Sequence, residues 1–79
     1  MLSEEYHKRS DALIDICLEK GFSEDAIMMI GILCCCEEME ETVGSIEEGI
    51  ARVTEFAKTA KTPEEIVAFA DKLSNGEIQ

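Results

Sequence analysis

Three kinds of side chain in this sequence can take part in chemistry: four cysteines, one histidine and eighteen acids. Thiolates and imidazoles act as nucleophiles, bases or zinc ligands, and carboxylates bind divalent cations. Each of these chemistries needs several groups held together in a suitable geometry. The spacing of these residues along the chain therefore decides which of them this protein can use.

Three of the cysteines are consecutive, Cys34, Cys35 and Cys36, and they end the most apolar stretch of the chain, Ala26–Cys36. Adjacent residues of a helix point about 100° apart, which is poor geometry for a disulfide. Neither a Cys-x-x-Cys motif nor a matching Cys/His pair is present, so a zinc site is not expected. The glutamates after Cys36 disfavour a thiolate. We therefore interpret the cysteines as small, reduced core residues, with redox or metal binding as the alternative.

The single histidine, His7, lies three residues after Glu4. This is the Glu-x-x-His spacing of helices that bind two irons, but a complete site needs a second such motif and more inward glutamates. Only a dimer could supply them here. No Ser or Cys stands at motif spacing from His7, so we expect a surface histidine. The sequence predicts no catalytic residue, no metal site, no cofactor and no enzymatic activity.

The acids are concentrated in one part of the chain, which carries Glu37, Glu38, Glu40, Glu41, Glu47 and Glu48. The first four fall in the last turns of a predicted helix, where the helix dipole favours cations. Local rules are often broken at functional sites, so this acidic corner is a candidate surface for a basic protein partner. The alternatives are a solvated face that keeps an apolar helix soluble, and divalent cation binding without the loop geometry of an EF-hand.

Capping signals divide the chain into four predicted helices. Ser3, Ser23, Ser45 and Thr62 are N-cap residues, while Gly21, Gly44 and Gly76 are stops. Ser45 to Glu48 and Thr62 to Glu65 are capping boxes, the second with a proline at the first helical position. The predicted helices span residues 4–20, 24–43, 46–61 and 63–74. Their short connections predict an all-α, compact, up-down four-helix bundle that forms a single helical domain over residues 1–79.

The first half of the predicted helix 24–43 is apolar on every side. A bundle of this size has difficulty covering such a segment, so we expect a symmetric dimer that packs through Ile27, Ile30, Gly31 and Cys34. Gly31 would let another backbone approach closely. The alternative is a tolerated helix glycine that costs about 1 kcal/mol relative to alanine.

The net charge of −11 argues against direct binding to nucleic acid or to anionic membranes. No apolar run approaches the roughly 18 residues needed to span a bilayer, and the start of the chain does not resemble a signal peptide. We expect a soluble, cytoplasmic protein. The sequence favours a small acidic helical protein–protein interaction module that self-associates as a homodimer. The alternative is an acidic inhibitor or adaptor, or a nucleic-acid mimic, that binds a basic protein through the Glu37–Glu48 corner.

Overall fold

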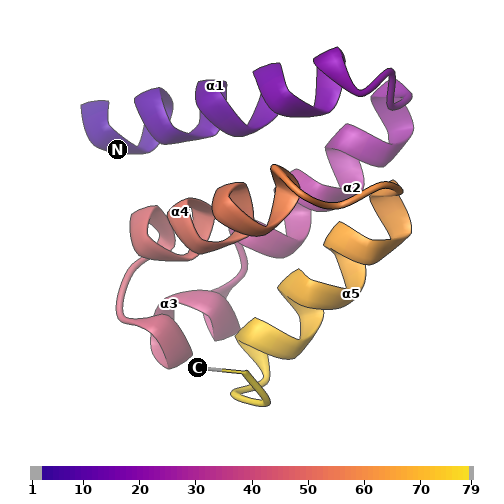
Figure 1. Cartoon of the computed structure of the whole chain (residues 1–79). Coiled ribbons are helices and arrows are strands. Elements are labelled where there is room, and N and C mark those ends of the chain that lie inside the picture. The colour runs from indigo at the N-terminus through magenta and orange to yellow at the C-terminus, as the bar shows by residue number, and fades with distance from the viewer. Residues whose placement is uncertain (1–2, 79) are drawn as a thin grey trace.

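The computed structural model describes residues 3–78, which form five helices and no strand within that range (Figure 1). The helices are α1 (Glu4–Glu19), α2 (Glu24–Cys34), α3 (Glu37–Val43), α4 (Ile46–Ala57) and α5 (Pro63–Ser74). The all-helical fold is therefore confirmed. The prediction of four helices was wrong.

The predicted caps position most of the helix ends. Ser3, Ser23, Ser45 and Thr62 each accept a hydrogen bond from the backbone N–H three residues on. Glu65 completes the predicted capping box at the start of α5. Gly21 and Gly44 adopt φ values of 79° and 113°, which L side chains rarely adopt. The third predicted helix ends earlier than expected, since α4 stops at Ala57 rather than near Lys61.

The predicted helix 24–43 is broken at Cys35 and Cys36. Cys35 has φ −104° and ψ 21°, and Cys36 is extended with ψ 158°, so the chain turns before α3 begins at Glu37. Cysteine is a modest helix former, and acids are favoured in a first turn. Glu37 and Glu38 therefore lie at the favourable end of α3 rather than at the unfavourable end of a long helix. The conflict with the helix dipole that the sequence suggested is therefore removed for Glu37 and Glu38, whereas Glu40 and Glu41 still lie in the last turn of α3.

The helices pack as two parallel pairs, α1 with α4 and α2 with α5, rather than as an up-down bundle. In Figure 1, α1 and α4 run in the same direction, as do α2 and α5. The Ser3 hydroxyl donates to the Glu47 carboxylate over 2.6 Å at one end of the α1–α4 pair, and the Lys20 ammonium donates to the Ala60 carbonyl over 2.8 Å at the other. The topology differs from the prediction because the short α3 brings the chain back to the start of α1.

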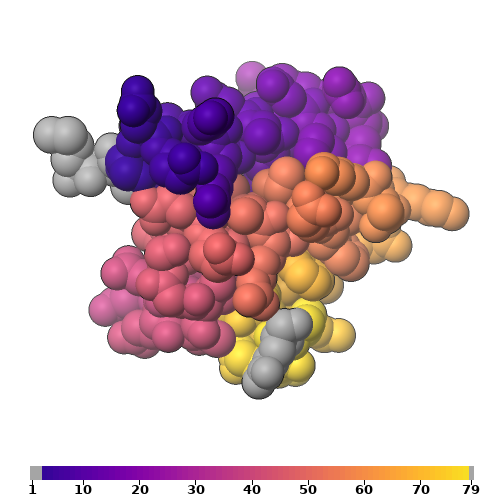
Figure 2. Space-filling model, turned by 60° about the vertical axis from the view of Figure 1, so that its left-hand side comes forward, coloured from indigo at the N-terminus to yellow at the C-terminus, as the bar shows by residue number. Residues whose placement is uncertain are grey.

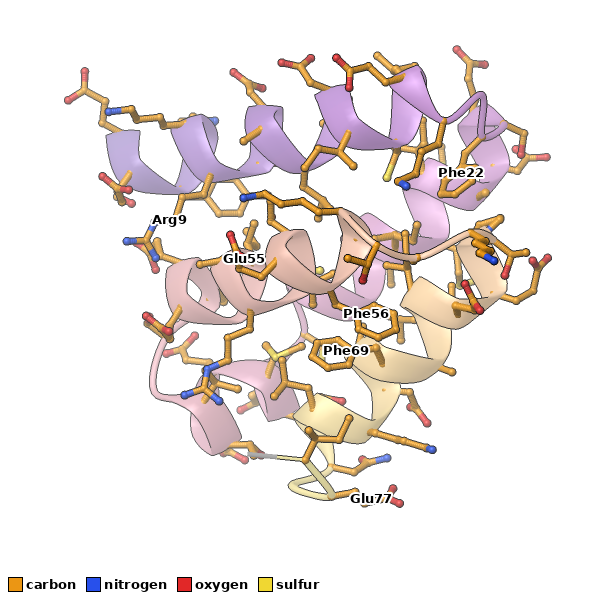
Figure 3. The ribbon with its side chains drawn as sticks, viewed as in Figure 1. Arg9, Phe22, Glu55, Phe56, Phe69 and Glu77 are labelled. Carbon is orange, nitrogen blue, oxygen red and sulfur yellow. The ribbon has the colours of Figure 1, made fainter. Side chains whose placement is uncertain are left out.

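The core lies where α1, α2, α4 and α5 meet, and α3 closes it from below in the view of Figure 1. Its buried apolar members are Leu13, Cys17, Ile30, Cys34, Met39, Ile50, Val53, Ala57, Ala60, Ile66, Ala70 and Leu73. Gly49 lies against the Met39 side chain, so a Cβ at this position would collide with it. The space-filling view in Figure 2 shows α1 packed along the top of α4. Phe56 and Phe69 stack at the edge of the core with ring centroids 4.4 Å apart (Figure 3).

Candidate functional site

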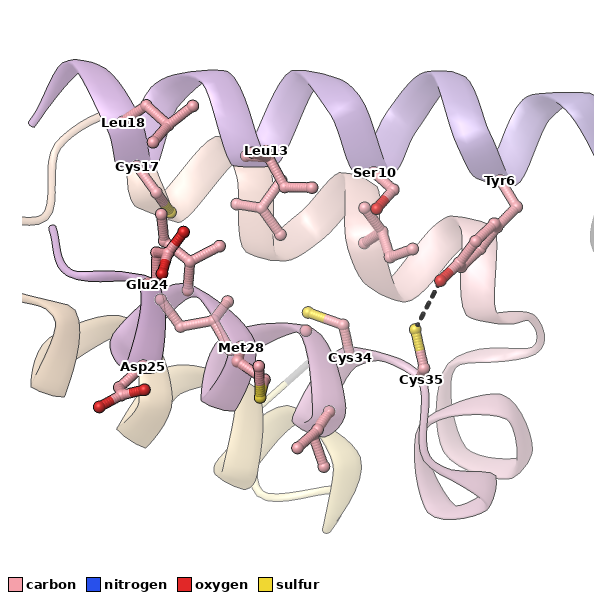
Figure 4. Close-up of a pocket in the computed structure, with 16 residues that line it drawn as sticks. Tyr6, Ser10, Leu13, Cys17, Leu18, Glu24, Asp25, Met28, Cys34 and Cys35 are labelled. Atoms are coloured by element: carbon pink, nitrogen blue, oxygen red, sulfur yellow. Dashed lines mark hydrogen bonds between the residues drawn. The ribbon is translucent and has the colours of Figure 1, made fainter.

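A groove with a volume of about 780 Å³ runs between α1 and α2 (Figure 4). Buried core side chains form its floor: Leu13 and Cys17 from α1, Ile30 and Cys34 from α2, and Ile50 from α4. The groove exists because α1 packs mainly on α4 and α2 mainly on α5, which leaves α1 and α2 scarcely in contact along their length. We call this surface the α1–α2 groove.

Large apolar side chains flank the α1–α2 groove and are open to solvent. Their exposed fractions are 37% for Ile14, 58% for Leu18, 63% for Met28 and 60% for Ile32. The one other exposed large apolar side chain in residues 3–78 is Met29, which lies on the opposite flank of α2. Large exposed apolar patches on soluble proteins mark interaction sites. The groove is therefore the best candidate for a functional surface.

All four residues predicted for self-association line the α1–α2 groove. Ile30 and Cys34 are almost fully buried in its floor, with 1% of their surface exposed, whereas Ile27 and Gly31 are half-buried. A Cβ built on Gly31 would have no neighbour within 4 Å, so there is open space beside this residue. The side chains of α2 that project from the groove are mainly Met28 and Ile32.

The two ends of the groove are polar. At one end the Tyr6 hydroxyl and the Cys35 thiol are hydrogen-bonded at 3.2 Å (Figure 4), and this bond, followed by burial, raises the pKa of Tyr6. At the other end lie the carboxylates of Glu24 and Asp25, in the first turn of α2. No lysine or arginine lines the groove in the described part of the chain. The groove is thus apolar along its length and acidic at one end.

The four cysteines are free, but they do not share one environment. Cys17 and Cys34 are core residues, Cys36 is half-buried and Cys35 is exposed. Burial raises the pKa of Cys17, and it raises the pKa of Cys34 to about 12. Both of these thiols are therefore protonated at neutral pH and are poor nucleophiles. The Cys36 thiol donates to the Leu33 carbonyl over 3.2 Å, at the end of α2.

The acids of the acidic corner differ in their contacts with the rest of the protein. Glu37, Glu38, Glu40 and Glu41 are exposed on α3. Glu47 is half-buried, and the hydrogen bond from the Ser3 hydroxyl is the largest of the causes that lower its pKa. Glu48 lies 3.5 Å from Arg52 and 4.0 Å from Arg9, which Figure 3 shows reaching from α1 towards α4. Glu47 and Glu48 therefore join α1 to α4, and the acids of α3 face solvent.

A second, smaller depression of about 570 Å³ lies between α2 and α5. Its apolar members are Ala26, Met29, Leu33, Pro63, Val67 and Ala68, and its acids are Asp25, Glu64 and Asp71. We call it the α2–α5 depression. This depression was not predicted from the sequence. A helical wheel that places Glu64, Val67, Ala68 and Asp71 on one side of α5 could have indicated it.

Comparison of the chain with protein families, curated proteins and solved structures finds no match. Across residues 3–78, no three or more His, Cys, Asp or Glu side chains gather in a way that could hold a metal ion. His7 is exposed and lies edge-on to the Tyr6 ring at 5.3 Å. None of the helices described is long and apolar enough to cross a membrane.

Proposed function

We propose that this protein is a small acidic helical protein–protein interaction module that self-associates through the α1–α2 groove. The observation that carries the proposal is the concentration of exposed large apolar side chains around this one groove. Ile14, Leu18, Met28 and Ile32 all flank it, and none of the residues that line it is basic. Covering these side chains with a second copy removes apolar surface from water, which is the main driving force for protein association.

A symmetric dimer suits the shape and charge of the groove. If a two-fold axis passes near Gly31, the two α2 helices pack antiparallel, and the open space at the glycine admits the facing helix. The helix α2 has 11 residues and is about 16 Å long. The acids at its start, Glu24 and Asp25, then lie at opposite ends of the interface in the two copies. Like charges are therefore kept apart.

Sedimentation equilibrium of two methionine variants tests the proposal. Met28 flanks the groove, whereas Met29 is the next residue of the same helix and faces the α2–α5 depression. Both are exposed, so replacing either by glutamine leaves the core intact. We expect Met28→Gln to weaken dimerisation by about 2 kcal/mol per dimer, roughly thirtyfold, because both copies lose apolar contact.

Met29→Gln is the matched control and should dimerise like the unmodified chain. A chain that stays monomeric at millimolar concentration would remove the self-association proposal. Equal weakening by the two variants would place the interface elsewhere on α2.

The alternative function, an acidic inhibitor or adaptor, is favoured by one observation. Glu37, Glu38, Glu40 and Glu41 are all exposed on the short helix α3. Binding of a basic protein there should weaken when Glu37 and Glu41 are replaced by glutamine, and it should weaken with added salt. Binding that is indifferent to both changes would remove this alternative.

A further inference from the structure

The α2–α5 depression is an apolar surface separate from the α1–α2 groove. Met29, 51% exposed, projects into it beside Leu33 of α2 and Val67 of α5. Figure 1 shows α2 and α5 running side by side in the same direction, so the depression follows both helices. From Pro63 to Asp71 it extends about 12 Å, or roughly two helical turns. A long thioether such as that of Met29 adapts to ligands of different shape.

Carboxylates stand at both ends of this depression. Asp25 and Glu64 lie in the first turns of α2 and α5, and Asp71 lies about two turns further along α5. All three are exposed, and none of them forms an ion pair within residues 3–78. No basic side chain of the described chain lines the depression. A ligand that fits must therefore be apolar in the middle and positively charged at its ends.

We propose that the α2–α5 depression binds an amphipathic helical segment of a partner protein, with two or three apolar side chains flanked by lysine or arginine. Helices bind in such grooves through apolar residues at i, i+3 or i+4 and i+7, which matches the length of this depression. A second copy of this chain does not fit here, because an antiparallel two-fold contact would bring Asp25 and Glu64 of one copy against Asp71 of the other. The proposal goes beyond self-association, since it uses the other flank of α2.

A synthetic peptide of about 14 residues serves as the probe, with leucines at i, i+3 and i+7 and lysines at both ends. Its binding to the full chain is measured by isothermal titration calorimetry. We expect the lysine peptide to bind and its glutamate counterpart not to bind. Met29→Gln should weaken binding by about tenfold through lost apolar contact, and Met28→Gln should leave it unchanged.

A charge-matched pair of variants locates the site. Glu64→Gln with Asp71→Asn removes two charges from the depression, and Glu37→Gln with Glu41→Gln removes two from the exposed face of α3. We expect the first pair to weaken binding about tenfold and the second to weaken it less than twofold, because Glu37 and Glu41 do not line the depression and exposed charges act weakly in salt. Equal loss in both pairs, or a larger loss in the α3 pair, would overturn the proposal in favour of general attraction or the acidic corner. Equal binding of the glutamate peptide would also overturn it.

The two proposals fail independently. Loss of peptide binding in Met29→Gln with dimerisation intact supports separate surfaces. Peptide binding that is lost in Met28→Gln and retained in Met29→Gln would show that the peptide occupies the α1–α2 groove. That result would contradict this inference. Self-association would still be tested separately, by the mass of the free chain in solution.

Discussion

A substitution at Gly31 should change the stability of the monomer and the strength of dimerisation in opposite directions. Gly31 lies inside α2, half-buried beside the α1–α2 groove, and a Cβ added to it would touch nothing within 4 Å. We expect Gly31→Ala to stabilise the monomer by about 1 kcal/mol, because alanine is the better helix former. The same methyl group should weaken dimerisation several-fold, since it occupies the space needed by the facing helix. Chemical denaturation and sedimentation equilibrium measure the two effects. Unchanged dimerisation would show that Gly31 is only a tolerated helix glycine.

Glu65 gives a pH dependence that can be assigned to one residue. Its carboxylate accepts hydrogen bonds from the N–H groups of Lys61 and Thr62, and these bonds lower its pKa from 4.5. A lowered pKa in the folded state adds stability above the unfolded pKa, and this stability is lost as the pH falls through the folded value. Glu65→Gln should therefore be less stable than the unmodified chain at pH 7, and the difference should narrow below pH 4.5. Thermal melts of the two proteins at pH 7 and at a pH below 4.5 measure this difference in stability. A difference that is the same at both pH values would contradict the assignment to Glu65.

The break between α2 and α3 can be tested at the scale of the element. Glu37 is the first residue of α3 and follows the extended Cys36, a conformation that suits the residue before a proline. We expect Glu37→Pro to change the free energy of unfolding by less than about 0.5 kcal/mol, because proline is tolerated at a first helical position. A continuous helix would lose about 3 kcal/mol or more.

Glu40→Pro is the control for this break. It removes the hydrogen bond from the Glu40 N–H to the Cys36 carbonyl inside α3, and it should cost about 3 kcal/mol. Urea denaturation distinguishes the two variants. If both destabilise the protein equally, residues 24–43 form one helix in solution.

Helix starts could be predicted from the sequence because they depend on neighbouring residues. Ser3, Ser23, Ser45 and Thr62 all cap their helices as predicted, since a cap needs only its own helix. The second half of the capping box predicted at Ser45 is not formed, because the Glu48 carboxylate lies near Arg9 and Arg52 instead.

The break at Cys35–Cys36 was missed because the apolar periodicity continues across it. In the structure, Met39 of α3 is buried against Gly49 of α4, a contact between helices that periodicity alone does not predict. The segment that forms one side of the groove was found because it is apolar on every side. For the same reason a helical wheel does not show which of its sides packs on α5 and which lines the groove.

At the scale of the whole molecule, charge opposes self-association. Each copy carries a net charge of −11, so two copies repel one another at long range, and salt screens this repulsion. Salt does not weaken contacts between apolar side chains. Dimerisation should therefore strengthen by several-fold between low and physiological ionic strength, which is opposite to the salt dependence expected for a lysine-flanked partner. Sedimentation at several NaCl concentrations measures the effect, and dimers that dissociate with added salt would require an interface built on ion pairs.

The most direct test of self-association is an isotope-filtered NMR measurement on a mixture of two samples, one with ¹³C-labelled methionine methyl groups and one unlabelled. We expect intermolecular NOEs from the Met28 methyl group to isoleucine and leucine methyl groups of the other copy, and none from Met29. Intermolecular NOEs from Met29 alone, or from neither residue at millimolar concentration, would contradict this prediction.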